Sequence, residues 1–308
     1  MRILRSGCMN GREGSGAPIY EGCCLTRVEV PTSSFNRIDQ SEMKMNECYL
    51  QTAIAAAKEA GRIQKLHFGH IHKVEYKGEI NPVTHVDKLC EQAIVQMIKD
   101  SFPEHDLLTE ESDFEGKGSR WRWIIDPLDG TTNYLHGFHC FSVSIGLEVD
   151  GEVKLGVVYY PLLDELFHAE KGEGAYLNGK RIFVSHTYPL DRGFLCTGFP
   201  YDVRERADLY LRYFRQFIIK SFAVRRLGSA AIDLCYLAAG RFDGFWELGL
   251  HPWDVAASSL IITEAGGRVT DFQGQPFNIY SEEILASNGL IHEEMLQTIQ
   301  EIPTKIRG

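Results

Sequence analysis

Two aspartates three positions apart follow an apolar run near the middle of the chain. The segment reads Trp123-Ile124-Ile125-Asp126-Pro127-Leu128-Asp129-Gly130-Thr131-Thr132-Asn133. Because Pro127 imposes an extended or turn conformation, both carboxylates and the carbonyl oxygen of Leu128 can converge on one point. Hard oxygen donors of this kind are the ligands that magnesium prefers. The segment therefore predicts a magnesium site, and the N–H groups of Gly130 and Thr131, where a helix can begin, are suited to bind phosphate.

Further acidic residues occur in three other segments. Glu110 follows the apolar stretch Leu107-Leu108, Asp254 follows Pro252-Trp253, and Asp87 ends a Thr84-x-x-Asp87 pattern. Each alone has an ordinary explanation: a solvated loop acid for Glu110, attraction to a helix dipole for Asp254, and a capping box for Asp87. Those explanations do not account for the whole combination of motifs.

The combination resembles the inositol monophosphatase family, which comprises magnesium-dependent, lithium-sensitive phosphatases that share a fold with fructose-1,6-bisphosphatases. The resemblance covers residues 46–300 and is most specific at Asp-Pro-Leu-Asp-Gly-Thr-Thr and at Pro-Trp-Asp-Val-Ala-Ala. Two segments support it, Gly228-Ser229-Ala230-Ala231 and Gly240-Arg241-Phe242-Asp243-Gly244.

This resemblance implies a role for particular residues, with two or three magnesium ions per active site. The first ion would be bound by Glu110, Asp126 and the carbonyl oxygen of Leu128. The second would be bound by Asp126, Asp129 and Asp254, and a third, weaker ion would share Glu110. The attacking water would be oriented and deprotonated by Thr131 with Asp87 or Glu110. The substrate would contact Gly130, Thr131, Ala230, Glu247 and Asp254.

Three positions depart from the family pattern. Thr109 stands where glycine is usual, and a β-branched residue would be strained there if the position needs a positive φ. Ser258 stands where glycine or alanine is usual, a change that affects packing more than ligation. Lys77 lies one residue closer to Asp87 than the family's lysine, so its role stays open.

The predicted function is magnesium-dependent hydrolysis of small phosphate monoesters by a metal-activated water, with inositol monophosphate as the first choice of substrate. Fructose-1,6-bisphosphate, histidinol phosphate and a 3′-phosphonucleotide are alternatives that fit the same metal core. The alternative from another class is a regulatory protein that binds RNA or the transcription machinery. The net charge of −10 counts against a nucleic-acid surface, and bound cations would make the acidic pocket attractive to phosphate.

Two other site types are disfavoured. Three histidines near the motifs, His136, His139 and His251, could suggest zinc, but zinc needs nitrogen or sulfur ligands at closer spacing. They are interpreted as structural or rim residues. No G-x-G-x-x-G motif follows a strand and no P-loop is present, which disfavours dinucleotide binding.

The composition predicts a globular cytoplasmic protein. The chain has 308 residues, 44% of them hydrophobic, and no apolar run reaches the roughly 18 residues of a membrane span. The eight cysteines are scattered, which favours buried free thiols over disulfides. The family resemblance further implies that the protein forms a homodimer. It also implies that the ligand is a small phosphorylated substrate.

Hydrophobic periodicity predicts the order of the elements. A helix is expected over residues 46–68 and a second after Asn81-Pro82, followed by hairpins with turns at Asp150-Gly151 and Asn178-Gly179. Helices and strands then interleave, with helices at 205–218, 229–239, 252–266 and 290–301 and strands at 242–247 and 284–287. Residues 1–44 are expected to be an N-terminal extension outside the core. Residues 45–185 would form an α+β half with an antiparallel sheet, and residues 186–308 an α/β half. The resemblance implies that the two halves build a layered αβαβα sandwich.

Overall fold

The computed structural model describes residues 35–70, 74–77, 81–112, 114, 116–200 and 202–302. The chain divides into two compact units, residues 1–43 and 44–308, and the fold below is that of the second. Most of the expected extension lies outside the described residues, so the division at 1–44, 45–185 and 186–308 stays a prediction.

The first helix, α1 (Phe35–His67), begins eleven residues before the predicted start at Asn46. Residues 35–45 contain no proline or glycine, so a helix can continue through them without an apolar stripe to mark it. The second helix, α2 (His85–Ser101), starts where the Thr84 pattern predicts it.

A seven-stranded sheet follows the chain order from β3 to β9. Its strands are β3 (Asp106–Thr109), β4 (Trp121–Asp129), β5 (Ser142–Val149), β6 (Glu152–Tyr160), β7 (Glu165–Glu170), β8 (Gly174–Leu177) and β9 (Lys180–Arg181). The pairs from β4 to β9 are antiparallel, as predicted. The first pair, β3 with β4, is parallel, so β3 adds one parallel strand to the predicted antiparallel sheet.

A five-stranded mixed sheet has the order β11-β10-β12-β14-β13. Its strands are β10 (Phe194–Thr197), β11 (Ala223–Arg225), β12 (Gly244–Leu248), β13 (Arg268–Thr270) and β14 (Glu283–Ser287). Strand β10 runs parallel to both β11 and β12, whereas β14 is antiparallel to β12 and β13. Smaller elements are the hairpin of β1 (Val74–Lys77) and β2 (Asn81–Thr84), the helix α3 (Thr131–Leu135) and the 3₁₀ turn η1 (Leu190–Arg192).

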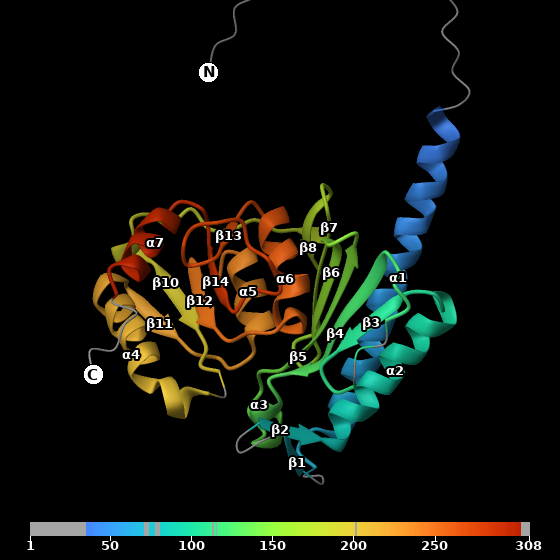
Figure 1. Cartoon of the computed structure of the whole chain (residues 1–308), viewed down its shortest axis with the longest axis horizontal. Coiled ribbons are helices and arrows are strands. Elements are labelled where there is room, and N and C mark those ends of the chain that lie inside the picture. Colours follow the sequence, from blue (N-terminus) through green and yellow to red (C-terminus); the bar gives the residue numbers. More distant parts are fainter. Residues whose placement is uncertain are drawn as a thin grey trace, which may run out of the picture. The chain divides into compact units, whose positions relative to one another are not determined.

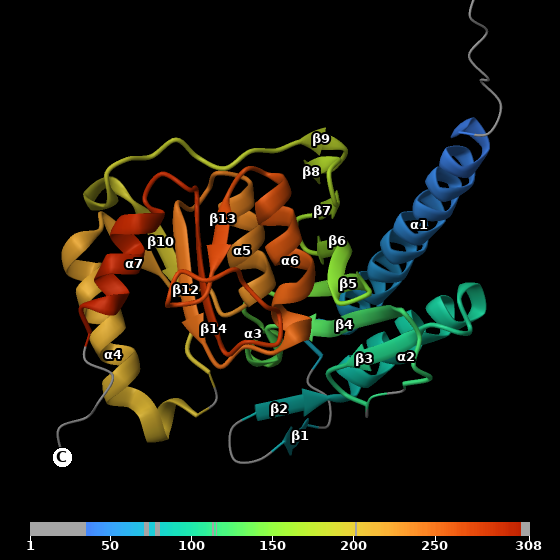
Figure 2. The same cartoon turned by 45° about the horizontal axis from the view of Figure 1, so that its top comes forward.

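Helices cover both faces of each sheet and build the predicted layers (Figures 1 and 2). Helices α1 and α2 pack on the outer face of the seven-stranded sheet, and α5 (Ala230–Ala238) and α6 (Pro252–Glu264) lie between the two sheets. Helices α4 (Val203–Lys220) and α7 (His292–Gln300) pack on the outer face of the five-stranded sheet. The αβαβα sandwich is therefore confirmed.

The burial of β5 shows how closely the layers meet. Its alternating sequence predicts one solvated face, yet Ser142, Ser144 and Glu148 are buried, because α6 covers that face. Glycines permit the approach: a Cβ atom built on Gly156 of β6 would lie 2.5 Å from the backbone oxygen of Ala257. Both predicted hairpin turns are present, with positive φ at each turn residue.

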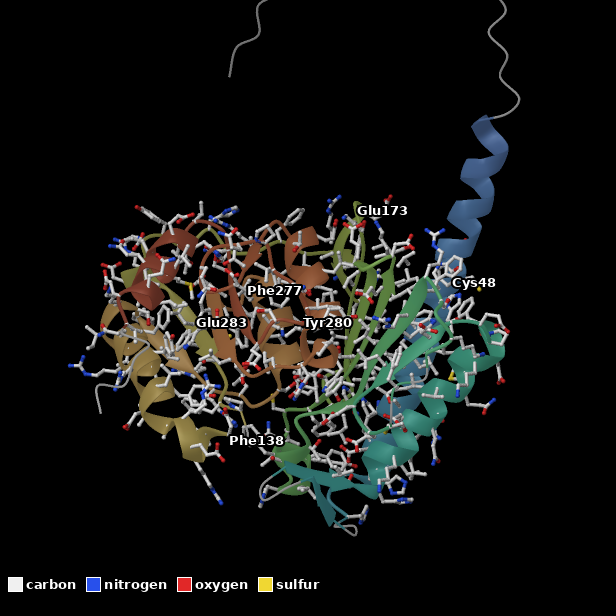
Figure 3. The ribbon with its side chains drawn as sticks, viewed as in Figure 1. Cys48, Phe138, Glu173, Phe277, Tyr280 and Glu283 are labelled. Carbon is white, nitrogen blue, oxygen red and sulfur yellow. The ribbon has the colours of Figure 1, made fainter. Side chains whose placement is uncertain are left out.

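Tyr280 ties the loop before β14 to the seven-stranded sheet. Its hydroxyl accepts a hydrogen bond from Arg122 Nη1 and donates one to Glu148 Oε2, both at 2.9 Å. Figure 3 labels Tyr280 among the side chains of this region. Residues some 130 positions apart thus join the two halves.

The described cysteines are free thiols, as predicted, and Cys90, Cys140, Cys196 and Cys235 are buried, whereas Cys48 is exposed. In the part of the chain that the structure describes, no helix is long and apolar enough to cross a bilayer.

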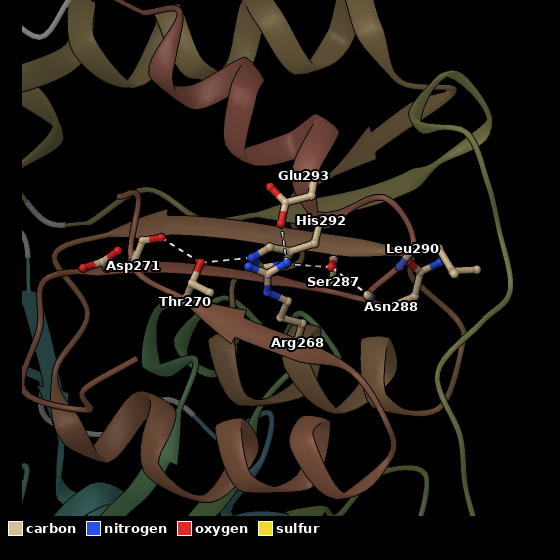
Figure 4. Close-up of polar contacts among 9 residues, drawn as sticks. Arg268, Thr270, Asp271, Ser287, Asn288, Leu290, His292 and Glu293 are labelled. Atoms are coloured by element: carbon tan, nitrogen blue, oxygen red, sulfur yellow. Dashed lines mark hydrogen bonds and ion pairs between the residues drawn. The ribbon is translucent and has the colours of Figure 1, made fainter. Parts of the chain in front are cut away.

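A buried histidine connects α7 to the five-stranded sheet (Figure 4). His292 Nε2 lies 3.0 Å from Thr270 Oγ1, and its Nδ1 lies 2.9 Å from Ser287 Oγ. The ring is fully buried. Burial, aided by the nearby charge of Arg268, lowers the pKa of His292 to about 4.

We expect His292 to make folding stability depend on pH. Because its pKa in the fold is below the ordinary 6.5, the unfolded chain binds more protons between these values. The free energy of unfolding should therefore fall by about 2 kcal/mol between pH 7.5 and pH 5 on account of this residue. Urea unfolding of wild type and His292→Gln at several pH values measures this contribution of His292 to the free energy of unfolding.

The exposed His186 supplies the matched control. The His186→Gln variant should keep the wild-type pH dependence of the free energy of unfolding. The His292→Gln variant should lose the fall of about 2 kcal/mol between pH 7.5 and pH 5. Identical pH slopes in wild type and His292→Gln would contradict the assignment.

Candidate active site

One pocket of about 630 Å³ collects nearly all the predicted site residues. It lies where β4 and β12 end and where α3, α5 and α6 begin. The predicted residues that line it are Glu110, Asp126, Leu128, Asp129, Gly130, Thr131, Ala230, Glu247 and Asp254. Asp87 lies behind the wall and reaches the site through Thr131.

A bulge in β4 makes both aspartates face this pocket. Asp126 pairs with Ser144 and Asp129 with Ser142, so one extra residue is accommodated on β4. The Leu128 N–H donates to Asp126 Oδ1 at 2.9 Å, which closes the turn around Pro127. The strand therefore does not end at Asp126 but continues through the bulge to Asp129.

Gly130 ends the bulged segment in a left-handed conformation with φ 94°. A Cβ atom here would lie 2.9 Å from the backbone oxygen of Cys140, so only glycine fits. The short helix α3 then begins at Thr131, as predicted.

Gln64 of α1 supports the same turn from behind. Its Nε2 donates to the carbonyl oxygens of Pro127 at 2.8 Å and Ser142 at 3.3 Å. The side chain is fully buried, and its Oε1 has no hydrogen-bond partner among the described residues. Sequence analysis did not identify Gln64, because its contacts join segments more than 60 residues apart.

The Asp129 carboxylate lies against the start of α5. It accepts hydrogen bonds from the Ser229 hydroxyl and from the N–H groups of Ala231 at 2.9 Å and Ala230 at 3.3 Å. The Ala230 N–H, predicted to contact substrate, thus points at a carboxylate in this structure. Ser229 was predicted only as part of a supporting segment.

Asp87 serves two purposes with its two oxygens. Oδ2 accepts from the Thr84 N–H at 2.8 Å and completes the capping box of α2. Oδ1 accepts from the Thr131 hydroxyl at 2.9 Å, and that hydroxyl also lies 3.0 Å from the Leu128 carbonyl oxygen. The capping explanation for Asp87 is confirmed, and the same side chain contacts Thr131 of the pocket wall.

Asp254 repeats this arrangement at the start of α6. Its Oδ2 accepts from the His251 N–H at 2.7 Å, as expected of an acidic residue in a first helical turn. Asp254 lines the pocket while capping the helix. His251 stacks on Trp253 at the pocket wall, with ring centroids 4.7 Å apart.

The loop that carries Glu110 is held by a residue the sequence analysis missed. Glu91 of α2 accepts from the Glu111 N–H at 2.9 Å and from the Ser112 hydroxyl. The Glu110 N–H donates to Ile125 O at 3.2 Å. Thr109 ends β3 without a positive φ, so the strain considered for this position is not present.

Burial and mutual repulsion control the charges in the pocket. Burial, followed by the charges of Glu110, Asp129 and Asp254, raises the pKa of Asp126 well above its ordinary value. Burial and then Glu110 do the same to the pKa of Asp254. Burial also raises the pKa of Asp129, although the hydrogen bonds from Ser229 and Ala231 act in the opposite direction.

The donor set fits a hard divalent cation. Four carboxylates and the Leu128 carbonyl supply oxygen ligands of the kind magnesium requires, and their repulsion is what a cation would relieve. Within the described residues, no three acidic, histidine or cysteine side chains already form a closed metal-binding group. His136 and His139 do not line this pocket, in agreement with the interpretation that they are not ligands.

Glu247 lies near the end of β12, in the same pocket as the four other carboxylates. Its side chain is buried and lines the pocket. Burial raises the pKa of Glu247 to about 8, while the charge of Arg226 acts to lower it. Arg226 and Asp233 also line the pocket and were not predicted, since neither lies in a segment with a chemical motif.

Comparisons with known proteins agree with this geometry. A model of the inositol monophosphatase family matches residues 45–304. The chain belongs to the inositol monophosphatase family. It is 43% identical over 251 residues to "Fructose-1,6-bisphosphatase/inositol-1-monophosphatase" of Aquifex aeolicus, covering 81% of this chain and 94% of that one. It is 41% identical to "Nus factor SuhB" of Escherichia coli strain K12, covering 82% and 96%.

Solved structures of the inositol monophosphatase family have the same fold. The inositol monophosphatase of Anabaena matches with a TM-score of 0.76 and 40% identity, covering 83% of this chain and 97% of that one. The suhB protein of Bartonella henselae matches with a TM-score of 0.80 and 38% identity, covering 82% and 99%. The predicted family and fold are confirmed, and members of this family are metal-dependent phosphatases.

We expect Gln64 to stabilise the turn that carries the site. Gln64→Leu keeps the volume of the side chain but removes the donor to two buried carbonyl oxygens, so unfolding should become easier by about 1–3 kcal/mol. Denaturant unfolding measures this change. Gln51→Leu is the matched control, because Gln51 is an exposed residue of the same helix. Equal stabilities of the two variants would contradict the role of Gln64.

Proposed function

We propose that this protein hydrolyses small phosphate monoesters with magnesium, and that inositol monophosphate is its substrate. One observation carries the proposal: carboxylates from separate segments, Glu110, Asp126, Asp129 and Asp254, line a single pocket into which Thr131 also faces. A bound divalent cation supplies positive charge that lowers the pKa of a coordinated water and neutralises phosphoryl oxygens.

The chain's own residues orient the attacking water. Asp87 Oδ1 holds the proton of the Thr131 hydroxyl, which leaves the hydroxyl oxygen free to accept a hydrogen bond from a water in the pocket. That hydrogen bond would hold the attacking water at the pocket wall. Asp87 is the group that can take up a proton through Thr131, because burial raises its pKa above its ordinary value.

The remaining carboxylates would bind the magnesium ions. Asp126 would contact both principal ions, with Glu110 and the Leu128 carbonyl on one side and Asp129 and Asp254 on the other. Ser229 and the start of α5 fix the Asp129 oxygens, and the α6 cap fixes Asp254, so these ligands are oriented before any ion binds. Substrate would contact Gly130, Thr131, Ala230 and Asp254.

The alcohol portion of the substrate would face Glu247, whose carboxyl can hydrogen-bond hydroxyl groups. This favours a polyol such as inositol. Fructose-1,6-bisphosphate, histidinol phosphate and a 3′-phosphonucleotide stay as alternatives, and the name of the Aquifex aeolicus relative supports fructose-1,6-bisphosphate among them. Membership of the inositol monophosphatase family supports three further parts of the proposal: inhibition by lithium, a homodimer and a cytoplasmic location.

A second candidate function rests on the relatives named "Nus factor SuhB", which are 41–43% identical to this chain. It is regulatory binding to RNA or the transcription machinery. The full acidic set favours catalysis as the main activity. Turnover of a panel of phosphate monoesters with magnesium, compared with RNA binding in the same salt, distinguishes the two: RNA binding without turnover would favour regulation.

We expect turnover to be absent in excess chelator, to return with magnesium and to be suppressed by calcium, which accepts a looser coordination geometry. Asp126→Asn should lower kcat by at least about 100-fold, because it removes the ligand shared by both ions. Steady-state kinetics with titrated magnesium measures both effects.

The control is Asp243→Asn, which changes a buried, hydrogen-bonded aspartate outside the pocket. It should lower stability without altering the magnesium requirement of the folded enzyme. Near-normal turnover by Asp126→Asn, with an unchanged magnesium requirement, would refute the shared-ligand assignment.

A further inference from the structure

Two exposed aromatic side chains from distant parts of the chain meet on one arginine of β4. The Cζ atom of Arg122 lies 5.1 Å from the ring centroid of Phe114, and its Nη1 donates to the Tyr280 hydroxyl at 2.9 Å. Phe114 is 51% and Tyr280 47% exposed, so burial of apolar area does little to hold either ring in place. The guanidinium is the contact that they share. We call these three residues the aromatic clasp.

A buried carboxylate fixes the arginine of the clasp. Glu148 of β5 is 4% exposed, and its Oε2 accepts from Arg122 Nη1 at 3.1 Å and from the Tyr280 hydroxyl at 2.9 Å. A buried charge needs such partners, because leaving it unpaired is costly. Arg122 is therefore held at one place on the sheet, and both aromatic side chains are attached to it.

The Phe114 end of the clasp leads to Glu110, four residues earlier in the chain. The Glu110 N–H donates to Ile125 O at 3.2 Å. On the other side of Phe114, the Lys117 N–H donates to Asp106 Oδ1 at 2.6 Å. The chain is thus anchored on either side of Phe114, and the contact of Phe114 with the arginine constrains where Glu110 lies.

The Tyr280 end leads to Asp254. Two residues after Tyr280, the carbonyl oxygen of Glu282 accepts a hydrogen bond from the Gly249 N–H at 2.7 Å. Gly249 belongs to the turn between β12 and α6, and the His251 N–H of this turn donates to Asp254 Oδ2 at 2.7 Å. Glu282, Gly249 and His251 all line the pocket. The aromatic clasp therefore connects two pocket carboxylates that come from different sheets.

These two carboxylates repel each other. The charge of Glu110 is the second cause, after burial, that raises the pKa of Asp254. This repulsion favours a wider separation of the two side chains until a cation binds between them. The clasp opposes that separation. A site whose ligands are already in place binds its ion more tightly than a site that must first be assembled.

We propose that Arg122 is a positioning residue that holds Glu110 and Asp254 at the spacing magnesium requires, and so sets the affinity of the pocket for this ion. Arginine suits the role because its planar group donates hydrogen bonds within the plane while an aromatic ring lies over its face. This inference rests on the proposed magnesium-dependent function.

The test removes each arm of the clasp separately. Tyr280→Phe removes only a hydroxyl, Phe114→Leu removes only an aromatic ring, and both variants keep the pair of Arg122 with Glu148. Each should raise the dissociation constant for Mg²⁺ about threefold, the effect of one lost hydrogen bond or one lost cation–π contact. Isothermal titration calorimetry of the full chain with magnesium, without substrate, measures this constant. The value of kcat at saturating magnesium should change less than about twofold.

The double variant tests whether both arms act through the same arginine. Because the clasp connects its two ends in series, breaking either arm already releases the connection. The combined change in the dissociation constant for Mg²⁺ should therefore be smaller than the product of the two single changes.

Two exposed aromatic residues that do not line the pocket supply matched controls. The Cζ atom of Arg181 lies 5.6 Å from the ring centroid of Phe183, so Phe183→Leu also removes a ring over a guanidinium. Tyr188→Phe also removes one exposed hydroxyl. Both controls should keep the wild-type dissociation constant for Mg²⁺.

The outcomes separate this inference from the function on which it rests. Wild-type magnesium affinity in Tyr280→Phe and Phe114→Leu would overturn the role of Arg122 and leave the proposed phosphatase intact. A fall of kcat at saturating magnesium, with metal binding unchanged, would also overturn it, because the clasp would then act on the substrate. Single effects that simply multiply in the double variant would overturn the connection in series. A wild-type protein that binds no magnesium would refute the proposed function itself.

Discussion

Gathering four carboxylates in one buried pocket is the constraint on which the rest of this structure depends. The buried carboxylates lose hydration and the four repel one another, and the raised pKa values of Asp126 and Asp254 express both effects. The fold offsets part of this cost with the positive ends of two central helices. The start of α5 donates N–H groups to Asp129, and Asp254 lies in the first turn of α6. A divalent cation would offset the remainder.

Two carboxylates cap a helix and also belong to the candidate site. Asp87 caps α2 with one oxygen and holds Thr131 with the other, and Asp254 caps α6 while lining the pocket. Capping fixes the orientation of each carboxyl without a separate set of contacts, because the helix N–H groups that need a partner already point at it. A residue's role in helix capping is therefore no argument against its role in a site.

Local chemistry decided which parts could be predicted from sequence. Pro127 and Gly130 restrict the backbone so strongly that the turn and the convergence of its oxygens follow from their types alone, whereas the bulge in β4 became visible only in the structure. The element order followed from periodicity. The buried polar residues of β5 could not be foreseen, since α6 covers that face from more than 100 residues away. Gln64 was missed for the same reason, because its partners are distant in sequence. Asp233 was missed because no chemical motif surrounds it.

The central claim is that one pocket of this chain binds cations through these carboxylates. Crystals of the full chain grown with manganese, which replaces magnesium and scatters anomalously, test it most directly. The account predicts anomalous peaks in the pocket about 2.0–2.4 Å from carboxylate oxygens, with Asp126 touching more than one ion. A pocket without a peak at saturating manganese, or a peak whose ligands exclude Asp126, would contradict it.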